Sequence, residues 1–423
     1  MSAVLRTGYK QTEVGVIPED WEVASIGNLC SAVLDCHHST PVWTTTGEVV
    51  IRNQNIREGK LDLSQPSYTD AGHFAERTRR ATPTHGDLVI TREAPMGLVC
   101  MIPEGLKCCL GQRMVLLRPD STAIEAPYLL YSILSEAVQR AISVAGGTGS
   151  TVANLRIPVL KGLLIAAPSP PEQRAIAAAL SDVDALLGGL ESLIAKKKGL
   201  KVAAMQQLLT GQTRLPGFSG EWEERTLNEV CWFQEGPGVR NTQFTTSGIK
   251  LLNGTNIFRG VLNLDTTTRF ISEAEAYGPY AHFMAEEGNI VLASSGITID
   301  RLHEKVAVVR RENLPFCMNT STIRFKPISG ISSSEFLYHF LVSDRFKTQI
   351  GGVATGSAQL NFGPSHVSRV SLSVPGIPEQ TAIAVILSDM DTELAALQTR
   401  RSKTQALKQA MMQELLTGRI RLI

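Results

Sequence analysis

Pro171-Glu172-Gln173 opens a stretch that ends in Leu208-Leu209-Thr210-Gly211, and both ends return 207 positions later as Pro378-Glu379-Gln380 and Leu415-Leu416-Thr417-Gly418. Residues 170–215 and 377–422 align without a gap, and 24 of the 46 positions are identical. An internal repeat of this length predicts a chain built from two copies of one structural unit.

Both copies of the repeated stretch have the apolar spacing of a helix that packs on another helix. Apolar residues recur at steps of four and three, at Ile176, Leu180, Val183, Leu187, Leu190 and Ile194 in the first copy and at Ile383, Leu387, Met390, Leu394 and Leu397 in the second. Proline suits the first turn and glycine the C-terminal cap. We therefore expect two helices of about 40 residues, roughly 60 Å long, that form an antiparallel pair. Gly188-Gly189 is expected to bend or break the first.

The segments before the two helices match more weakly but in the same order. Trp21-Glu22 corresponds to Trp222-Glu223, and Asn55-Ile56 with Gly59 corresponds to Asn256-Ile257 with Gly260. Short apolar runs predict strands and mixed α/β domains, at 49–51, 88–90, 114–117, 163–165, 290–292 and 306–309. Residues 128–142 and 334–350 are each expected to form one helix.

The ends of the chain suggest a circular order of the repeat. Thr-Gly occurs at Thr7-Gly8 as well as at the ends of both long helices, so the chain starts partway through one repeat and stops partway through another. We expect two repeated α/β domains joined by two long antiparallel helices in a pseudo-twofold circular arrangement. The expected ranges are an N-terminal arm at 1–20, a first domain at 21–167, a central helical region at 168–215, a second domain at 216–374 and a C-terminal helical region at 375–423.

Composition is that of a globular protein, with 43% hydrophobic residues among 423. No apolar run reaches the ~18 residues of a membrane span, and the start lacks a secretory signal, so a soluble, cytoplasmic chain without a membrane partner is expected. Seven cysteines without a Cys-x-x-Cys pair argue against a disulfide framework. Cys36-His37-His38 has no second ligand pair, so a polar loop is favoured over a zinc site.

Motifs of catalysis are missing from the sequence, and no catalytic residue is expected. The only Pro-Pro pair, at Pro170-Pro171, is not the Asn/Asp-Pro-Pro-aromatic motif that holds a flipped base in a DNA methyltransferase. Gly146-Gly147-Thr148-Gly149 lacks the Gly-Lys-Ser/Thr ending of a phosphate loop, which favours a hinge or tight turn over a nucleotide site.

The duplicated Pro-Glu-Gln, Leu-Ser-Asp and Leu-Leu-Thr-Gly order resembles the specificity subunits of type I restriction–modification enzymes over essentially the whole chain. The stretch from Ile17-Pro18 to Trp21-Glu22 is similar to that family too. The resemblance implies two target-recognition domains that each read one half of a split site in double-stranded DNA, on helices that set the spacing. It also implies two methyltransferase subunits and restriction–translocase subunits as partners. S-adenosylmethionine and ATP would belong to those partners, and this chain would hold no cofactor or metal.

Candidate DNA contacts follow from side-chain chemistry, because Arg, Asn and Gln make bidentate contacts with base edges and arginines hold phosphates. In the first domain they are Gln54, Asn55, Arg57, Arg92, Gln112 and Arg113, with Arg77, Arg79 and Arg80 for phosphates. In the second they are Asn253, Thr255, Asn256, Ser294, Ser295, Thr298, Asn319 and Thr320, with Arg240 and Arg301 for phosphates. Lys197, Lys198 and Lys201 are candidates for a backbone contact from the spacer helix.

Structural alternatives stand beside these assignments. Asn55 and Asn256 occur in both domains, which are expected to read different sequences, so turn capping is an equal interpretation. The lysine run also fits a solvated helix face.

Two other functions remain open at this stage. One is a specificity subunit for a stand-alone or fused methyltransferase system. The other is a protein-interaction scaffold that never touches DNA, which the near-neutral balance of 41 basic and 40 acidic residues favours.

Overall fold

The structure, a computed structural model, describes residues 6–93, 95–146, 154–356 and 359–422. It divides into two compact units, unit 1 (1–191 with 399–423) and unit 2 (192–398). The glycine-rich segment at 146–149 was interpreted above as a hinge or tight turn, and its residues 147–149 lie outside the described residues. Among the helices that are described, none combines the length and the apolar character that crossing a membrane requires.

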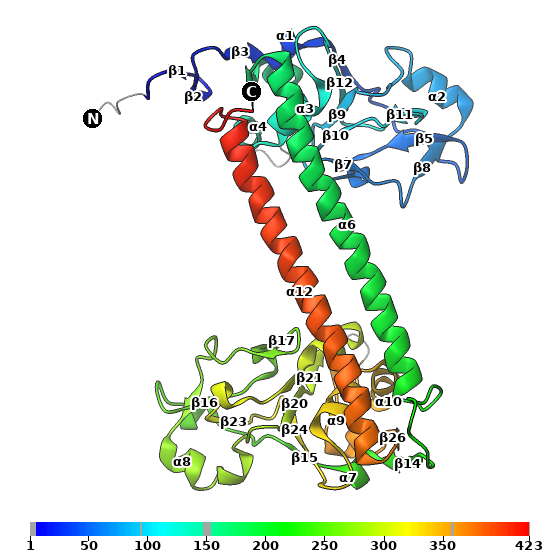
Figure 1. The fold of residues 1–423 in the computed structure, drawn as a ribbon, viewed down its shortest axis with the longest axis vertical. Coiled ribbons are helices and arrows are strands. Elements are labelled where there is room, and N and C mark those ends of the chain that lie inside the picture. Colours follow the sequence, from blue (N-terminus) through cyan, green and yellow to red (C-terminus); the bar gives the residue numbers. More distant parts are fainter. Residues whose placement is uncertain (1–5, 94, 147–153, 357–358, 423) are drawn as a thin grey trace. The chain divides into compact units, whose positions relative to one another are not determined.

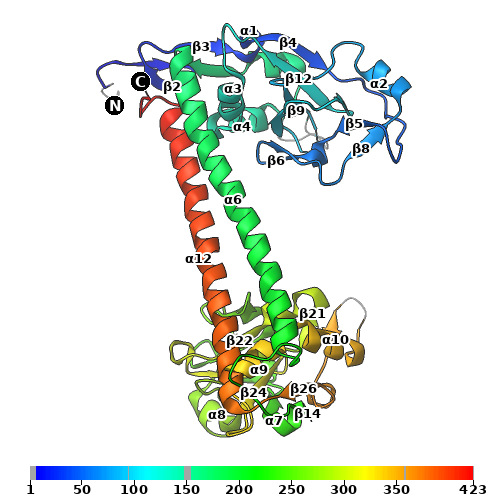
Figure 2. The ribbon, with the colours of Figure 1, turned by 45° about the vertical axis from the view of Figure 1, so that its right-hand side comes forward.

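The repeated stretches form two continuous helices of 39 residues each, α6 (Pro170–Leu208) and α12 (Ile377–Leu415). Each begins in one unit and ends in the other. The predicted break at Gly188-Gly189 is wrong, because α6 runs through both glycines. Within each unit the helical segments lie side by side (Figures 1 and 2), and most of the predicted seam is buried, including Leu180 and Leu387.

Ion pairs show that the helical segments are antiparallel within each unit. In unit 1, Asp184 accepts from Lys408 at 2.7 Å and Glu191 accepts from Arg401 at 2.6 Å. In unit 2 the counterpart of the first pair joins Lys201 to Asp391. Asp184 of α6 corresponds to Asp391 of α12 in the repeat, and Lys408 of α12 corresponds to Lys201 of α6. The same ion pair therefore occurs in both units with the two helices in exchanged roles, as the predicted pseudo-twofold circular arrangement requires.

Among the described residues, the α/β part of unit 1 (Figure 1) contains a four-stranded sheet, a three-stranded sheet and the two-stranded pairs β1-β2, β3-β13 and β6-β7. An antiparallel sheet has the order β10-β9-β12-β4, and a second sheet has the order β11-β5-β8, with β11 and β5 parallel. Strand bounds are β1 (Tyr9–Thr12), β2 (Gly15–Pro18), β3 (Glu22–Ser25), β4 (Cys30–Asp35), β5 (Glu48–Ile51), β6 (Ile56–Arg57), β7 (Lys60–Leu61), β8 (Ser67–Thr69), β9 (Leu88–Thr91), β10 (Val99–Met101), β11 (Cys108–Leu110), β12 (Met114–Pro119) and β13 (Leu164–Ala167). Helix bounds are α1 (Ile26–Leu29), α2 (Ala71–Arg77), α3 (Ala126–Leu134), α4 (Glu136–Ala145) and α5 (Ile157–Gly162).

Unit 2 repeats this topology in its own sheets, β15-β24-β20-β22 and β19-β16-β23, with β16 and β23 parallel. Strand bounds are β14 (Glu223–Thr226), β15 (Cys231–Glu235), β16 (Ile249–Leu251), β17 (Ile257–Phe258), β18 (Val261–Leu262), β19 (Phe270–Ile271), β20 (Ile290–Ala293), β21 (Ser295–Ile297), β22 (Val306–Val308), β23 (Phe316–Cys317), β24 (Thr322–Pro327), β25 (Leu360–Asn361) and β26 (Ser371–Val374). Helix bounds are α7 (Leu227–Val230), α8 (Glu273–Tyr277), α9 (Ser334–Leu341), α10 (Asp344–Val353) and α11 (Pro364–Val367). Each of the six predicted apolar runs contributes to a strand, although Leu163 and Val309 lie just outside β13 and β22.

Two helices expected as single pieces are each broken in two, which corrects that prediction. Ser135 and Ser343 start the second piece, and their side chains accept from the backbone N–H groups of Val138 and Phe346 at 3.4 and 3.3 Å. A serine hydroxyl that caps an N-terminus favours a new helix over continuation of the old one.

The Pro-Glu-Gln motif anchors each long helix to its α/β part. Gln173 accepts from the backbone N–H of Glu125 at 2.8 Å and donates to the carbonyl of Pro168 at 2.9 Å. Gln380 makes the equivalent bonds in unit 2, from Ser333 at 2.9 Å and to Pro375 at 2.8 Å. Both glutamine side chains are buried, so these bonds satisfy polar groups that water does not reach.

Candidate nucleic-acid interface

The asparagines shared by the two units are structural. Asn55 accepts the backbone N–H of Arg52 at 3.0 Å and donates to the carbonyl of Asp62 at 3.0 Å. Asn256 is buried and makes the same two bonds, from Asn253 at 2.9 Å and to Asn263 at 3.1 Å. These bonds support the turn-capping interpretation for both asparagines, and the base contact that was the alternative stays a prediction.

Each capped turn leads into a two-residue hairpin. Strands β6 and β7 are joined by Glu58-Gly59, and β17 and β18 by Arg259-Gly260. All four turn residues have positive φ, with values of 48° and 84° in the first turn and 51° and 78° in the second. Two consecutive positive φ angles are typical of a type I′ turn, which explains why a glycine follows Asn-Ile in both repeats.

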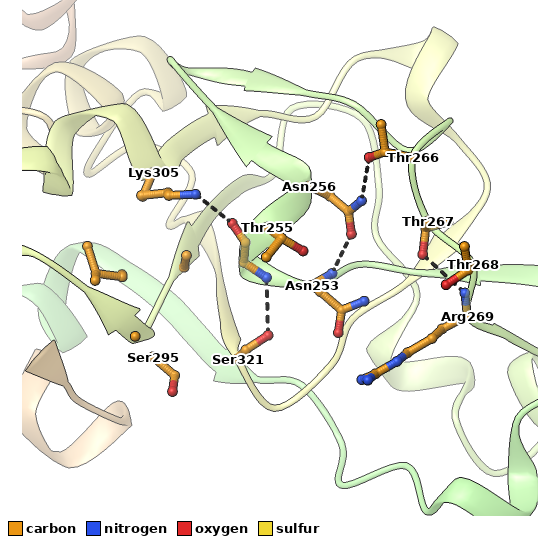
Figure 3. A pocket seen from close by; sticks show the side chains of 14 residues that line it. Asn253, Thr255, Asn256, Thr266, Thr267, Thr268, Arg269, Ser295, Lys305 and Ser321 are labelled. Atoms are coloured by element: carbon orange, nitrogen blue, oxygen red, sulfur yellow. Dashed lines mark hydrogen bonds between the residues drawn. The ribbon is translucent and has the colours of Figure 1, made fainter. Parts of the chain in front are cut away.

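In unit 2 the predicted residues gather around a polar cavity of about 390 Å³ (Figure 3). Asn253, Thr255, Asn256 and Ser295 line it, as expected from their place after strands β16 and β20. The lining also includes residues that the sequence did not single out: Thr266, Thr267, Thr268, Arg269, Lys305 and Ser321. Hydroxyl, amide and guanidinium groups without an acidic side chain suit the acceptor-rich surface of a nucleic acid.

A second cavity of about 460 Å³ shares Ser295 and Ser321 with the first. The predicted residues Ser294 and Thr320 line it, together with Glu235, Asn361 and His366. Ser295 donates to the side chain of Asn361 at 2.7 Å. Burial raises the pKa of Glu235, which is the acidic side chain in the lining of this cavity.

Two side chains in this region hold loops in place. Lys305 donates to the carbonyls of Gly254 and Ile257 at 3.0 and 2.8 Å, and burial lowers its pKa. Asn319 is buried and donates to the side chain of Asn253 at 2.8 Å. Asn319 therefore orients Asn253, and the DNA contact predicted for Asn319 itself stays a prediction.

Two arginines of unit 1 that were predicted to contact DNA are internal. Arg77 is buried and donates to the carbonyls of Leu110 and Ser39 at 2.7 and 2.8 Å. Arg92 pairs with Asp35 at 2.7 Å and donates to the carbonyl of Leu155 at 3.0 Å. These bonds give both guanidinium groups a role in the fold, and the DNA contacts predicted for Arg77 and Arg92 stay predictions.

Other candidates of unit 1 stay accessible. Gln54 and Arg79 are exposed, and Arg80 is exposed while donating to the carbonyl of Asp35 at 3.1 Å. Arg57 is exposed but pairs with Asp62 at 3.3 Å. Gln112 donates to the carbonyl of His38 at 2.6 Å, and Arg113, with φ of 66°, pairs with Glu93 at 2.9 Å.

Among the remaining candidates of unit 2, Arg240 and Thr298 are exposed. Arg301 pairs with Glu304 at 2.8 Å. An exposed arginine that already has a carboxylate partner must break that ion pair to bind a phosphate. Arg301 would have to break its pair with Glu304, so Arg240 is the better candidate for a phosphate contact.

The lysine run on α6 divides into paired and exposed members. Lys197 pairs with Glu393 of α12 at 2.7 Å, and Lys201 pairs with Asp391. These ammonium groups pair α6 with α12 within unit 2, and the backbone contact predicted for them stays a prediction. Lys198 is exposed and keeps that prediction.

The Cys36-His37-His38 segment has partners other than a metal. Cys36 is buried, and burial raises the pKa of its thiol. His37 and His38 lie 3.2 and 3.1 Å from the carboxylates of Glu76 and Asp35. In the parts of the chain that the structure describes, no group of three potential ligands has the arrangement of a metal site.

Known proteins similar to this chain are specificity subunits. The type I restriction enzyme MjaVIII specificity subunit of Methanocaldococcus jannaschii is 24% identical over 420 residues, which cover 96% of this chain and 94% of that protein. The putative type I restriction enzyme MjaX specificity subunit of the same organism is 23% identical, with coverage of 98% and 96%.

Solved structures show the same fold. The S subunit of a type I restriction-modification system from M. genitalium matches with a TM-score of 0.58 and 18% identity, and 98% of each chain is covered. A chain from a study of complex assembly and conformational transition of the type I R-M system matches with a TM-score of 0.59 and 15% identity, over 96% of this chain and 99% of that one.

The family model "Type I restriction modification DNA specificity domain" matches residues 18–196 and again residues 219–407. The two matches fall on the two repeats and together span most of the sequence. The chain therefore belongs to the family of type I restriction modification DNA specificity domain proteins.

Proposed function

We propose that this chain is the sequence-specific DNA-recognition subunit of a type I restriction–modification complex. Each unit would read one half of a split site in double-stranded DNA. The observation that carries the proposal is the repeated topology with different polar side chains. The same strands and capped hairpin occur in both units, while the exposed middle residue of the 3-10 turn is Gln54 in one and Thr255 in the other.

The proposal assigns the chemistry to other subunits. This chain would bind two methyltransferase subunits, which use S-adenosylmethionine, and restriction–translocase subunits, which use ATP. Its own part is binding and positioning, without catalysis and without a cofactor. A split target suits two readers on one chain, since base edges specify the sequence while phosphate contacts only position the protein.

The test is to express the chain with its methyltransferase partner and to map methylated bases by single-molecule sequencing. We expect one motif made of two short specific halves and a fixed gap. Replacing residues 223–374 with the corresponding segment of a relative should change one half of the motif and leave the other unchanged.

Two outcomes would count against the proposal. A stable complex without new methylation would favour the protein-interaction scaffold. A domain exchange that altered both halves of the motif would show that the two units do not read independently. Supplying a restriction subunit and ATP then separates a complete restriction complex from a methyltransferase that acts alone.

A further inference from the structure

An arginine lies on an aromatic ring beside the polar cavity of unit 2. The guanidinium of Arg269 lies 5.2 Å from the ring centroid of Phe244. Its side chain is exposed and lines the same cavity as Asn253, Thr255 and Ser295 (Figure 3). Within the described residues, the structure gives this guanidinium no carboxylate partner.

Unit 1 contains the same pair of groups. The guanidinium of Arg52 lies 4.7 Å from the ring centroid of Trp43, whose side chain is 43% exposed. Arg52 is close to the hydroxyl of Ser67, at 3.5 Å. It too has no carboxylate partner in the part of the chain that the structure covers.

The two rings occupy equivalent positions. Trp43 precedes Thr44, which forms an isolated bridge with Tyr68, and Phe244 precedes Thr245, which forms the same bridge with Phe270. Each ring therefore lies next to the strand that begins at Ser67 in unit 1 or at Phe270 in unit 2.

The two arginines, in contrast, come from opposite sides of the site. Arg52 corresponds to Asn253, because the backbone N–H of each donates to the capping asparagine three residues later. Ser67 corresponds to Arg269, because each directly precedes the bridge residue. The first of these two positions holds Arg52 in unit 1 and Asn253 in unit 2, and the second holds Ser67 and Arg269. Each unit therefore has one arginine beside its ring, but the two arginines occupy different positions of the repeat.

We propose that Arg52 and Arg269 are the DNA-contacting arginines of their half-sites, donating to a guanine edge or a phosphate. The ring takes one face of the guanidinium and leaves its N–H groups at the edge available. A side chain already held on a ring loses less conformational freedom when it binds. Arg57, Arg113 and Arg301 are exposed, but each of them is paired with a carboxylate.

This inference rests on the proposed function, and the test keeps the two apart. The complex of the full chain with its methyltransferase subunits is prepared as wild type, Arg52→Gln and Arg269→Gln. Methylation is mapped by sequencing, and DNA affinity is measured by anisotropy over a salt series. If the wild type methylates no specific motif, the proposed function fails. If the wild type has a split motif and both variants match it in motif and affinity, only this inference is overturned.

We expect each variant to weaken binding by about 5- to 150-fold, the range for losing one bidentate contact. A guanine contact predicts that one base position in one half of the motif becomes tolerant. A phosphate contact predicts an unchanged motif. It also predicts that the slope of the logarithm of affinity against the logarithm of salt concentration becomes shallower by about one. Arg259→Gln is the matched control, because Arg259 also lies over an exposed ring, Phe258 at 5.1 Å, but does not line the cavity. An equal loss in this control would overturn the assignment to the ring beside the cavity.

The exchange of positions gives a second test. Arg52→Asn alone should lose affinity, and the double variant Arg52→Asn with Ser67→Arg should recover it to within about 3-fold of wild type, well inside the loss expected from one contact. The double variant rebuilds in unit 1 the arrangement found in unit 2. Thermal unfolding of each variant confirms that it is folded. A folded double variant that fails to recover would contradict the equivalence of the two arginines.

Discussion

Arg421 donates two hydrogen bonds to Glu172, at 2.6 and 2.8 Å, although 249 positions separate the two residues. Arg214 donates to Glu379 in the same manner, at 2.7 Å in both bonds. Each glutamate also accepts from a tryptophan N–H, Trp21 at 3.1 Å or Trp222 at 3.2 Å. The segment after α12 thus meets Glu172 and Trp21 through Arg421, just as the segment after α6 meets Glu379 and Trp222 through Arg214. We call the first set of contacts the closure, because these noncovalent contacts complete the circular repeat.

Removing this closure should destabilise unit 1. Glu172 is buried, so Arg421→Ala would leave a buried carboxylate without its cation, and we expect the free energy of unfolding to fall by about 2 kcal/mol. Urea unfolding followed by tryptophan fluorescence measures the change. Arg419→Ala is the control, because Arg419 is exposed and should change stability by less than about 0.5 kcal/mol. Equal stability of Arg421→Ala and wild type would show that the closure contributes nothing.

The turn that follows α12 offers a steric test of the same closure. Gly418 has φ of 67°, and a Cβ at this position would lie 2.5 Å from Pro18 and 3.1 Å from Trp21. Gly217 has φ of 88° but nothing within 4 Å. Both alanine variants carry the cost of positive φ, about 1 kcal/mol, and only Gly418→Ala adds a clash. We expect a lower thermal midpoint for Gly418→Ala than for Gly217→Ala, and similar midpoints would contradict the close packing at the closure.

A buried histidine should make the stability of unit 2 depend on pH. His339 bonds Ser388 of α12 at 3.0 Å, and burial, with Lys201 nearby and Asp391 opposing, lowers its pKa to about 4. Between that value and its ordinary pKa of 6.5 the unfolded chain binds the proton and the folded chain does not. Stability is therefore expected to fall as the pH drops from 6.5 to 4, by about 3 kcal/mol from this group.

The substitution His339→Gln isolates that contribution. Glutamine retains a hydrogen-bonding group and does not titrate, so the difference between wild type and variant in urea unfolding should shrink or change sign as the pH falls through this window. A difference that stays constant from pH 7 to pH 4 would mean that His339 is protonated equally in both states.

Local periodicity and repetition were enough to predict most of the fold. The two helices, their antiparallel pairing and the circular closure follow from residues that are identical in both copies, such as Glu172 and Glu379. The contacting side chains did not follow, because their environment comes from distant segments. In the sequence Arg92 resembles a loop arginine, because its partner Asp35 is 57 positions away. Arg269 was not predicted as a contact, because the ring of Phe244, on which it lies, is 25 positions earlier in the sequence.

Two adjacent residues of the 3-10 turn after β16, Thr255 and Asn256, are expected to have different roles, one in DNA recognition and the other in the fold. Asn256 is buried and its side chain is fully engaged, whereas Thr255 is exposed at the cavity. We expect Asn256→Ala to lower the free energy of unfolding by about 1–3 kcal/mol, since it leaves buried backbone groups without partners, and to leave the methylated motif unchanged. Thr255→Ala should do the reverse, altering tolerance in one half of the motif at nearly constant stability.

Urea unfolding and methylation mapping on the same two variants test both statements, and Asn55→Ala against Gln54→Ala repeats the comparison in unit 1. A changed motif in a stably folded Asn256→Ala complex would return that residue to the base-reading role, because turn capping alone gives no reason for altered specificity.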